Sequence, residues 1–218
     1  MKLSSKRILI YLIGMIILAA GLTLNTKVTL GVSSILSIPY CLSQIFSFNF
    51  SNVVFVWYCI LILFQILIHL HLKKERSVCL IDVLQILVSL IFTRIMNVFS
   101  LIIPTFETDL SGFFASIPFR IIMLLIAIIL TGIGAALTLD MKLIPNPGDG
   151  IVAALAELLR KPVGTSKNIV DIFCVCLTAA ISFLLKGKVI GVGIGTLIAM
   201  LGVGRVINFI NSHFDIHY

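Results

Sequence analysis

Long apolar segments alternate with short polar ones along the whole chain of 218 residues. Six apolar segments are close to the roughly 20 residues that an α-helix needs to cross a bilayer. Two further apolar segments are too short to cross, and each follows a glycine-bearing loop. The pattern predicts an all-α, polytopic membrane protein with six transmembrane helices and two short re-entrant or interfacial helices. The six long segments are residues 8–24, 52–69, 79–103, 113–139, 168–185 and 189–210, and the short ones are 35–46 and 151–159.

The same pattern occurs twice. Leu22-Thr23-Leu24-Asn25 near the start corresponds to Leu137-Thr138-Leu139-Asp140, and a second pair of related motifs closes the two halves. This second pair is Arg94-Ile95-Met96-Asn97 and Arg205-Val206-Ile207-Asn208. A duplicated hydrophobic unit is typical of secondary transporters, whose binding sites lie between the repeats.

The duplication predicts the domain organisation. We expect one membrane domain over residues 1–218, with a first repeat at about residues 8–103 and a second at about residues 113–210. Each repeat has three crossings if its short segment does not cross. Because three is an odd number, the second repeat is expected to be inverted relative to the first.

Composition and charge agree with a membrane location. Hydrophobic residues make up 60% of the chain and charged residues 11%, whereas soluble domains carry about 25% charged residues. The net charge of +7 comes from basic residues at the ends of apolar segments, such as Lys73-Lys74-Glu75-Arg76, where positive charge sets orientation. Both termini are therefore expected in the cytoplasm, with the loop of Glu107 and Asp109 outside. This distribution indicates a lipid bilayer as partner and not a nucleic acid.

The two short segments are the first candidate site. Gly31-Val32-Ser33-Ser34 precedes one of them, and Pro147-Gly148-Asp149-Gly150 precedes the other. A half-helix that starts there would direct unpaired N–H groups into the protein, where they could bind an anion or a carbonyl group. Ser33, Ser34 and Asp149 are suitable capping residues. The alternative, a helix that lies flat at the membrane surface, stays open.

Ionisable residues inside apolar segments are the second candidate. Asp82, Arg94, Asp171 and Arg205 would each cost about 3 kcal/mol at the bilayer centre, so each is expected to face protein or water. Asp171 is three residues from Asn168 and Asp82 three from Gln85, which places each pair on one helix face. The candidate substrate-binding residues are Ser33, Ser34, Gln85, Arg94, Gly148, Asp149, Asn168, Asp171 and Arg205.

Several kinds of chemistry have no sequence signal. The chain has no G-x-x-x-x-G-K-[ST] phosphate-binding loop. No pattern of a nucleophile with a base, or of metal ligands, is visible. We therefore expect a protein that is not an enzyme and that has no cofactor and no metal site.

The residues around the candidate sites also resemble a known family. The stretches at residues 30–40 and 84–89, Pro147-Gly148-Asp149-Gly150, and the glycine-rich stretch at residues 191–199 are similar to those of bacterial YczE/YitT-type integral membrane proteins. The resemblance covers nearly the whole chain. It implies a multi-pass protein of the bacterial inner membrane that is permease-like and has no established substrate. The chain departs from the family at Leu87 and Gly193, where a proline and an acidic residue are usual.

These observations favour a small secondary transporter or permease with its site at the interface of two inverted repeats. Asp171 would bind a coupling cation or a cationic group of the substrate. The alternative is a non-transporting membrane scaffold, or the substrate-capturing subunit of a larger transport complex. The substrate, the direction of transport and the oligomeric state stay open at this point.

The orientation can be tested by labelling. In a variant without the native cysteines, Lys73→Cys and Thr108→Cys are expected to react with an impermeant thiol reagent from opposite sides of the membrane. The reason is the excess of basic residues on the side of Lys73. Labelling of both positions from the same side would contradict the orientation.

Overall fold

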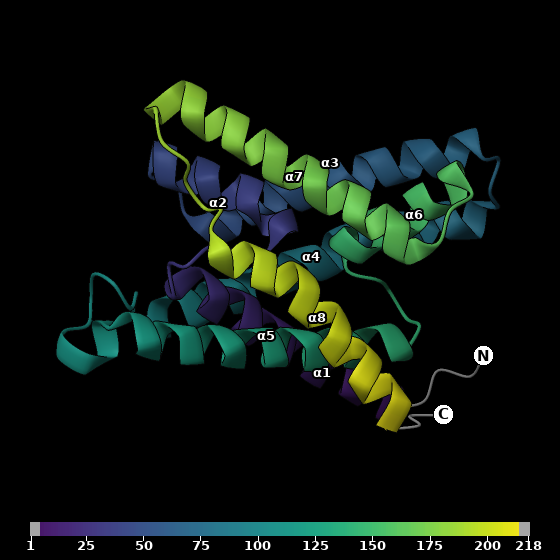
Figure 1. Ribbon diagram of the computed structural model, residues 1–218. Helices are drawn as coiled ribbons and strands as arrows, with labels where there is room; N and C mark the ends of the chain where they lie inside the picture. Colours follow the sequence, from purple (N-terminus) through teal and green to yellow (C-terminus); the bar gives the residue numbers. More distant parts are fainter. Residues whose placement is uncertain (1–4, 214–218) are drawn as a thin grey trace. The chain divides into compact units, whose positions relative to one another are not determined.

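The computed structural model describes residues 5–213, which form eight α-helices and one short 3₁₀ helix (Figure 1). Six of the helices are long and apolar enough to cross a membrane, which confirms the expected all-α architecture with six spans. Both chain termini, which the sequence predicts to lie in the cytoplasm, are outside the described residues. The bounds are α1 Ser5–Lys27, α2 Ser34–Phe46, α3 Phe50–His71, α4 Arg76–Ile102, η1 Gly112–Ala115, α5 Ile117–Asp140, α6 Pro147–Leu159, α7 Val163–Lys186 and α8 Ile194–His213.

Four helix starts differ from the sequence prediction by four or five residues. One of them is the start of α7, which lies at Val163 instead of 168. α6 begins at Pro147, because proline suits the first turn and the Asn146 side chain caps the helix by accepting from the Gly148 N–H. α5 begins at Ile117 instead of 113, and the residues before it form η1. α8 begins at Ile194 instead of 189, because Gly191 adopts a positive φ of 85° that ends any regular helix there.

The chain divides into two compact units, and each combines segments from both halves of the sequence. Unit 1 consists of the described parts of residues 1–34, 94–143 and 191–218, and so contains α1, α5 and α8. Unit 2 consists of residues 35–93 and 144–190, and so contains α2, α3, most of α4, α6 and α7. Helices from the two proposed repeats therefore pack together within each unit.

The main contact of unit 1 is the antiparallel pair of α1 and α5 (Figure 1). Gly14 of α1 lies against Gly134 and Leu137, and Gly21 lies against Thr131, so the residue numbers rise on one helix as they fall on the other. A Cβ atom at Gly21 would come within 2.5 Å of the Thr131 backbone nitrogen. Small residues thus allow the two backbones to approach closely, as is usual between membrane helices.

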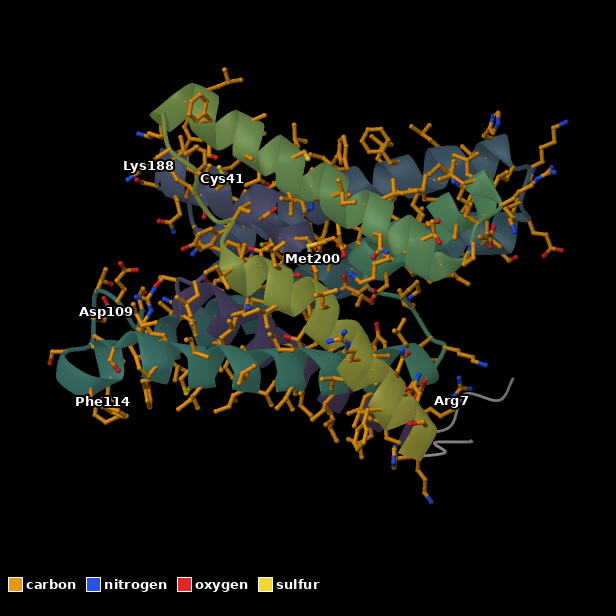
Figure 2. All side chains as sticks on the ribbon, in the orientation of Figure 1. Arg7, Cys41, Asp109, Phe114, Lys188 and Met200 are labelled. Atoms are coloured by element: carbon orange, nitrogen blue, oxygen red, sulfur yellow. The ribbon has the colours of Figure 1, made fainter. Side chains whose placement is uncertain are left out.

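Two arginines bind carbonyl groups at opposite ends of this pair. Arg7, in the first turns of α1, donates to the carbonyl oxygen of Met141, which follows α5 (Figure 2). Arg120, in the first turn of α5, donates to the carbonyl oxygen of Val28 at 2.9 Å, just after α1, and also to Glu107. Guanidinium groups at helix C-termini bind orphan carbonyl groups and complement the helix dipole. Each helix of the pair therefore stabilises the end of the other.

The third long helix of unit 1, α8, also packs along α5 (Figure 1). Gly202 lies against Ile128 and Val206 lies against Gly132, so α8 runs parallel to α5. At its start, the Gly195 N–H donates to the Leu30 carbonyl oxygen at 2.8 Å. The glycines of residues 191–195 bring the backbone against the loop after α1.

In unit 2, α3 and α4 form an antiparallel hairpin, and each short helix packs on a long helix of the other half. The Tyr58 and Phe92 rings are 6.2 Å apart, and His69 contacts Asp82, which fixes the register of the hairpin. From α2, Ser37 bonds to Thr178 of α7 at 2.8 Å, and Cys41 bonds to Ser182. From α6, Gly150 lies directly against the Gln65 side chain of α3. From Ser37–Thr178 to Cys41–Ser182 the residue numbers rise on both helices, so α2 runs parallel to α7. They also rise together from the contact of Asn146 with Tyr58 to that of Gly150 with Gln65, so α6 runs parallel to α3.

The close contact of α1 with α5 can be tested with two glycine substitutions. Gly21→Ala is expected to lower the melting temperature by several degrees, because overpacking typically costs about 1–3 kcal/mol and the added Cβ would meet backbone atoms. Gly204→Ala in α8 is the control, since nothing lies within 4 Å of its would-be Cβ, and alanine favours helix. Thermal unfolding of the purified variants measures both. Equal effects would contradict the close contact.

Candidate functional site

Unit 2 buries a cluster of polar side chains that come from α3, α4 and α7. Buried polar groups in a membrane protein are costly and usually functional. The cluster has two acidic centres, one on α6 and α7 and one on α3 and α4. The first turn of α6 lies between them, because Gly150 contacts α3 while Asp149 interacts with α7.

The first acidic centre contains two carboxylates and one lysine. Asp171 of α7 is 1% exposed, and its Oδ2 accepts a hydrogen bond from the Lys167 Nζ at 2.7 Å. Asp149 of α6 is half-buried and interacts electrostatically with both Lys167 and Asp171. With all three groups ionised, the centre carries a net charge of −1. Lys167 was not among the expected partners of Asp171, although its spacing of four residues is one at which helix side chains meet.

The start of α6 does not offer the unpaired N–H groups that the sequence suggested. Asn146, and not Asp149, is the N-cap, and its side chain accepts from the Gly148 N–H at 3.0 Å. The backbone N–H groups of Asp149 and Gly150 both donate to the Asn146 carbonyl oxygen. The Tyr58 hydroxyl of α3 also bonds to the Asn146 side chain. With these groups paired and a carboxylate beside them, this helix start disfavours an anion.

The second acidic centre is a hydrogen-bonded group of three residues. Asp82 of α4 is 2% exposed, and its Oδ2 lies 2.6 Å from the Nδ1 of His69 on α3. Its other oxygen accepts from the Gln65 side chain, also on α3. Both carboxylate oxygens therefore contact nitrogen atoms of α3, and with Asp82 ionised the His69 Nδ1 is the donor. No lysine or arginine forms an ion pair with Asp82 in the described part of the chain.

Gln85 and Ser89 continue the same face of α4 and lack hydrogen-bond partners. They are 0% and 1% exposed, and no described residue bonds to the Gln85 amide or the Ser89 hydroxyl. Asp82 and Phe92 belong to the same face and contact α3, so this face is turned towards α3. Asp82 and Gln85 therefore lie on one face of α4, as predicted, and both side chains are buried.

The remaining candidate residues are not in these two centres. Asn168 is exposed, so it does not join the buried Asp171 as expected, because the buried face of α7 runs through Ser166, Val170 and Cys174. Arg94 and Arg205 are also exposed and belong to unit 1. Ser33 and Ser34 belong to unit 1 as well, and the Ser33 N–H donates to Asn25 Oδ1 at 3.0 Å.

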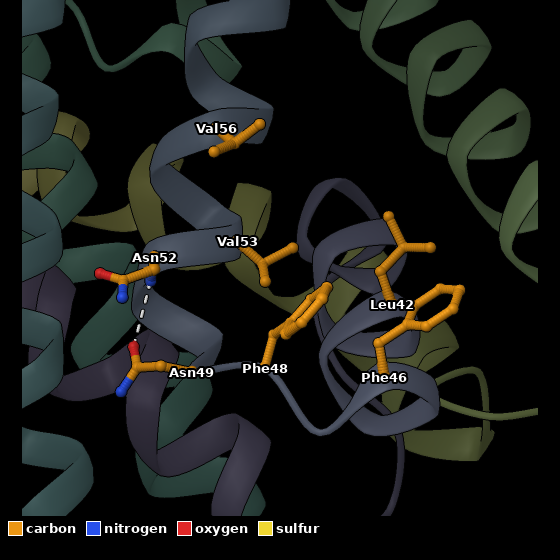
Figure 3. Close-up of a pocket in the computed structure, with 7 residues that line it drawn as sticks. All are labelled: Leu42, Phe46, Phe48, Asn49, Asn52, Val53 and Val56. Atoms are coloured by element: carbon orange, nitrogen blue, oxygen red, sulfur yellow. Dashed lines mark hydrogen bonds between the residues drawn. The ribbon is translucent and has the colours of Figure 1, made fainter.

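A separate pocket of about 450 Å³ lies at the turn between α2 and α3 (Figure 3). It is lined by apolar side chains, including the exposed Phe46 and Phe48, with Asn49 and Asn52 at its edge. The Asn49 side chain accepts from the Asn52 N–H and so caps α3. The lining suits an apolar group such as a lipid acyl chain and offers no charged group to a polar solute. Among the described residues, no cluster of three or more His, Cys, Asp or Glu could hold a metal ion.

Comparison with known proteins identifies a family but no characterised relative. Residues 5–212 match the profile of a family of unknown function, DUF6198, and the chain belongs to this family. No curated protein and no solved structure is significantly similar to the chain. The resemblance to YczE/YitT-type proteins therefore stays a prediction. What is established is a member of this family with six helices that can cross a membrane.

The charge balance of the first acidic centre can be tested with Lys167→Met. The variant leaves Asp149 and Asp171 without their lysine, so we expect a melting temperature several degrees lower at about pH 8. At low pH the loss is expected to be smaller, because burial raises the pKa of Asp149, which then takes up a proton. Lys74→Met is the matched control, since it removes the exposed ion pair with Glu157, which should contribute little. Equal losses in both variants, or a loss that does not shrink at low pH, would contradict this account.

Proposed function

We propose that this member of the DUF6198 family is a small secondary transporter of the bacterial cell membrane, built from two inverted repeats. Its binding site would lie inside unit 2, where helices of both repeats meet. The observation that carries the proposal is the buried acidic centre of Asp149, Lys167 and Asp171. With both carboxylates ionised the centre has an excess negative charge, which a bound cation would stabilise, so a coupling cation or a cationic group of a small solute would bind there.

Helix directions in unit 1 support the inverted arrangement. Consecutive membrane-spanning helices must alternate in direction. If α2 crossed the membrane, α1 and α5 would be parallel, but they are antiparallel. If α6 crossed, α5 and α8 would be antiparallel, but they are parallel. Both pairs therefore favour three crossings in each repeat, and an odd number of crossings inverts the second repeat relative to the first.

The short helices of unit 2 support the same arrangement. α2 packs on α7 and α6 packs on α3, so each short helix contacts the long helix that follows the other short helix. Their starts also meet, because Gly148 of α6 lies against Ile35 of α2. Such an exchange of partners is expected from two-fold related repeats. Interrupted helices buried in protein also surround the binding sites of many transporters.

The alternative is a non-transporting scaffold or the substrate-capturing subunit of a larger complex. Such a protein would be purified with a partner in fixed stoichiometry. It would also bind a solute without moving it across a membrane. Proteoliposomes that contain only this chain therefore separate the two functions.

The proposal is tested by binding and transport with a defined panel of compounds. Na⁺, K⁺, amino acids, choline and spermidine are applied to the purified protein in thermal-shift assays, and to proteoliposomes on a solid-supported membrane. We expect at least one compound to raise the melting temperature and to produce a transient current. Asp171→Asn and Asp149→Asn are expected to abolish both responses, because each removes part of the acidic centre.

Asp109→Asn is the matched control for these variants. The Thr105 N–H and the Thr108 hydroxyl donate to the Asp109 carboxylate and hold its pKa below the usual range, so it is a charged but exposed aspartate. This variant should respond like the wild type. Stabilisation by a compound without any current, together with a copurified partner, would favour the subunit function instead. Unchanged responses in Asp171→Asn would contradict the site.

A further inference from the structure

We propose that Asp82 and His69 form a proton-binding site inside unit 2, which supplies the coupling ion of the proposed transporter. The coupling role depends on the proposed function, whereas the binding of a proton does not. With the proton assigned to this centre, the acidic centre of Asp149 and Asp171 is left for a cationic group of the solute.

The hydrogen bonds around Asp82 argue for a proton and against a larger cation. The Gln65 amide donates to one carboxylate oxygen, and the His69 ring nitrogen lies 2.6 Å from the other. Hard cations such as Na⁺ need several free oxygen ligands. Here the N–H donors direct positive charge towards the place that such a cation would occupy. A proton needs no such space, because it binds to the imidazole ring itself.

The charge balance of the pair depends on this proton. Neutral His69 donates from Nδ1 to the Asp82 carboxylate, so the pair carries a charge of −1. A proton from water that binds to Nε2 forms the imidazolium ion, and the pair becomes neutral. Release of the same proton to water restores the charge. Asp171 differs, because its partner Lys167 keeps a fixed positive charge.

Other titratable groups on the surrounding helices do not supply a fixed counter-charge to Asp82. α6 carries Asp149 at its start and Glu157 at its end, and Glu157 is paired with Lys74 at 2.7 Å. On the hairpin itself, α3 also carries Tyr58, Cys59 and His71, and α4 carries Cys79. Arg76 and Arg94 of α4 are exposed and form no ion pair with Asp82. The only positive partner of Asp82 among the described residues is therefore one that must first take up a proton.

Gln85, Ser89 and Gln65 point independently to hydration beside the pair. The register of the hairpin, in which Tyr58 faces Phe92 and His69 faces Asp82, places Gln85 level with Gln65. The Gln85 amide, the Ser89 hydroxyl and the Gln65 carbonyl oxygen are all buried and have no partner among the described residues. Such groups normally bind water, because leaving them unpaired costs several kcal/mol in an apolar surrounding. A hydrated path along this face gives a proton access to the pair.

The proton site is tested by nuclear magnetic resonance on the full chain in nanodiscs, with ¹⁵N-labelled histidine. We expect one histidine signal, lost in His69→Gln, to report protonation of the imidazole ring when the sample is acidified. Asp82→Asn should change this response to acidification, because the imidazolium ion loses its carboxylate. Asp109→Asn, an exposed aspartate, is the matched control and should leave the response unchanged. A His69 signal that does not titrate, or that titrates identically in Asp82→Asn, would overturn the proposal.

Proton movement into proteoliposomes with an enclosed pH-sensitive dye tests the coupling role separately. The compounds that produce currents in the wild type should drive proton movement, and His69→Gln should abolish it. Gln85→Leu should slow it while leaving the His69 titration in place. If His69 titrates as expected but no compound moves protons or solute, the proton site stands and the transport function fails. If protons move equally well in His69→Gln, the coupling role is wrong.

Discussion

The close antiparallel contact of α1 with α5 is the interaction on which the rest of unit 1 depends. Glycines let the two backbones approach, and an arginine at each end binds the carbonyl groups that the other helix leaves unpaired. In a bilayer no water is available to satisfy such groups, so the helices must do it for one another. The pair also fixes the direction of α5, against which α8 packs in parallel. These helix directions favour the proposed inverted repeats.

Unit 2 uses the same kind of helix packing to bury charge. Its two acidic centres lie on either side of the first turn of α6, but they differ in their positive partners. Asp171 has a lysine whose charge is fixed, whereas Asp82 has a histidine whose charge depends on a proton. Two carboxylates with one lysine suit a cationic group. The pair of Asp82 and His69, which is neutral only when protonated, suits a proton. Both follow from the cost of leaving a charge unbalanced away from water.

The helices could be predicted far better than the sites. Hydrophobic segment length located all six long helices, because the bilayer imposes a length that any crossing helix must meet. The start of α6 was placed too late, since the glycines and Pro147 look like loop residues until the Asn146 cap is seen. Asp82, Gln85 and Asp171 were recognised because polar residues stand out in apolar segments, and Asp149 was recognised as a possible cap of the second short helix. His69 and Lys167 were missed, because each resembles an ordinary polar residue near a helix end. Gln65 was missed although it lies inside an apolar segment, the same signal that marked Gln85.

The sequence by itself determined the all-α class and the number of long helices, since both depend on local hydrophobicity. From internal similarity it also predicted two related halves. Only the tertiary structure decided which polar residues meet. It paired Asp171 with Lys167 and Asp82 with His69 and Gln65, and it left Asn168, Arg94 and Arg205 exposed. The physical reason is that partners across a helix contact depend on the rotation and register of two helices. Those are set by packing at small residues such as Gly150, which no pattern along a single segment reveals.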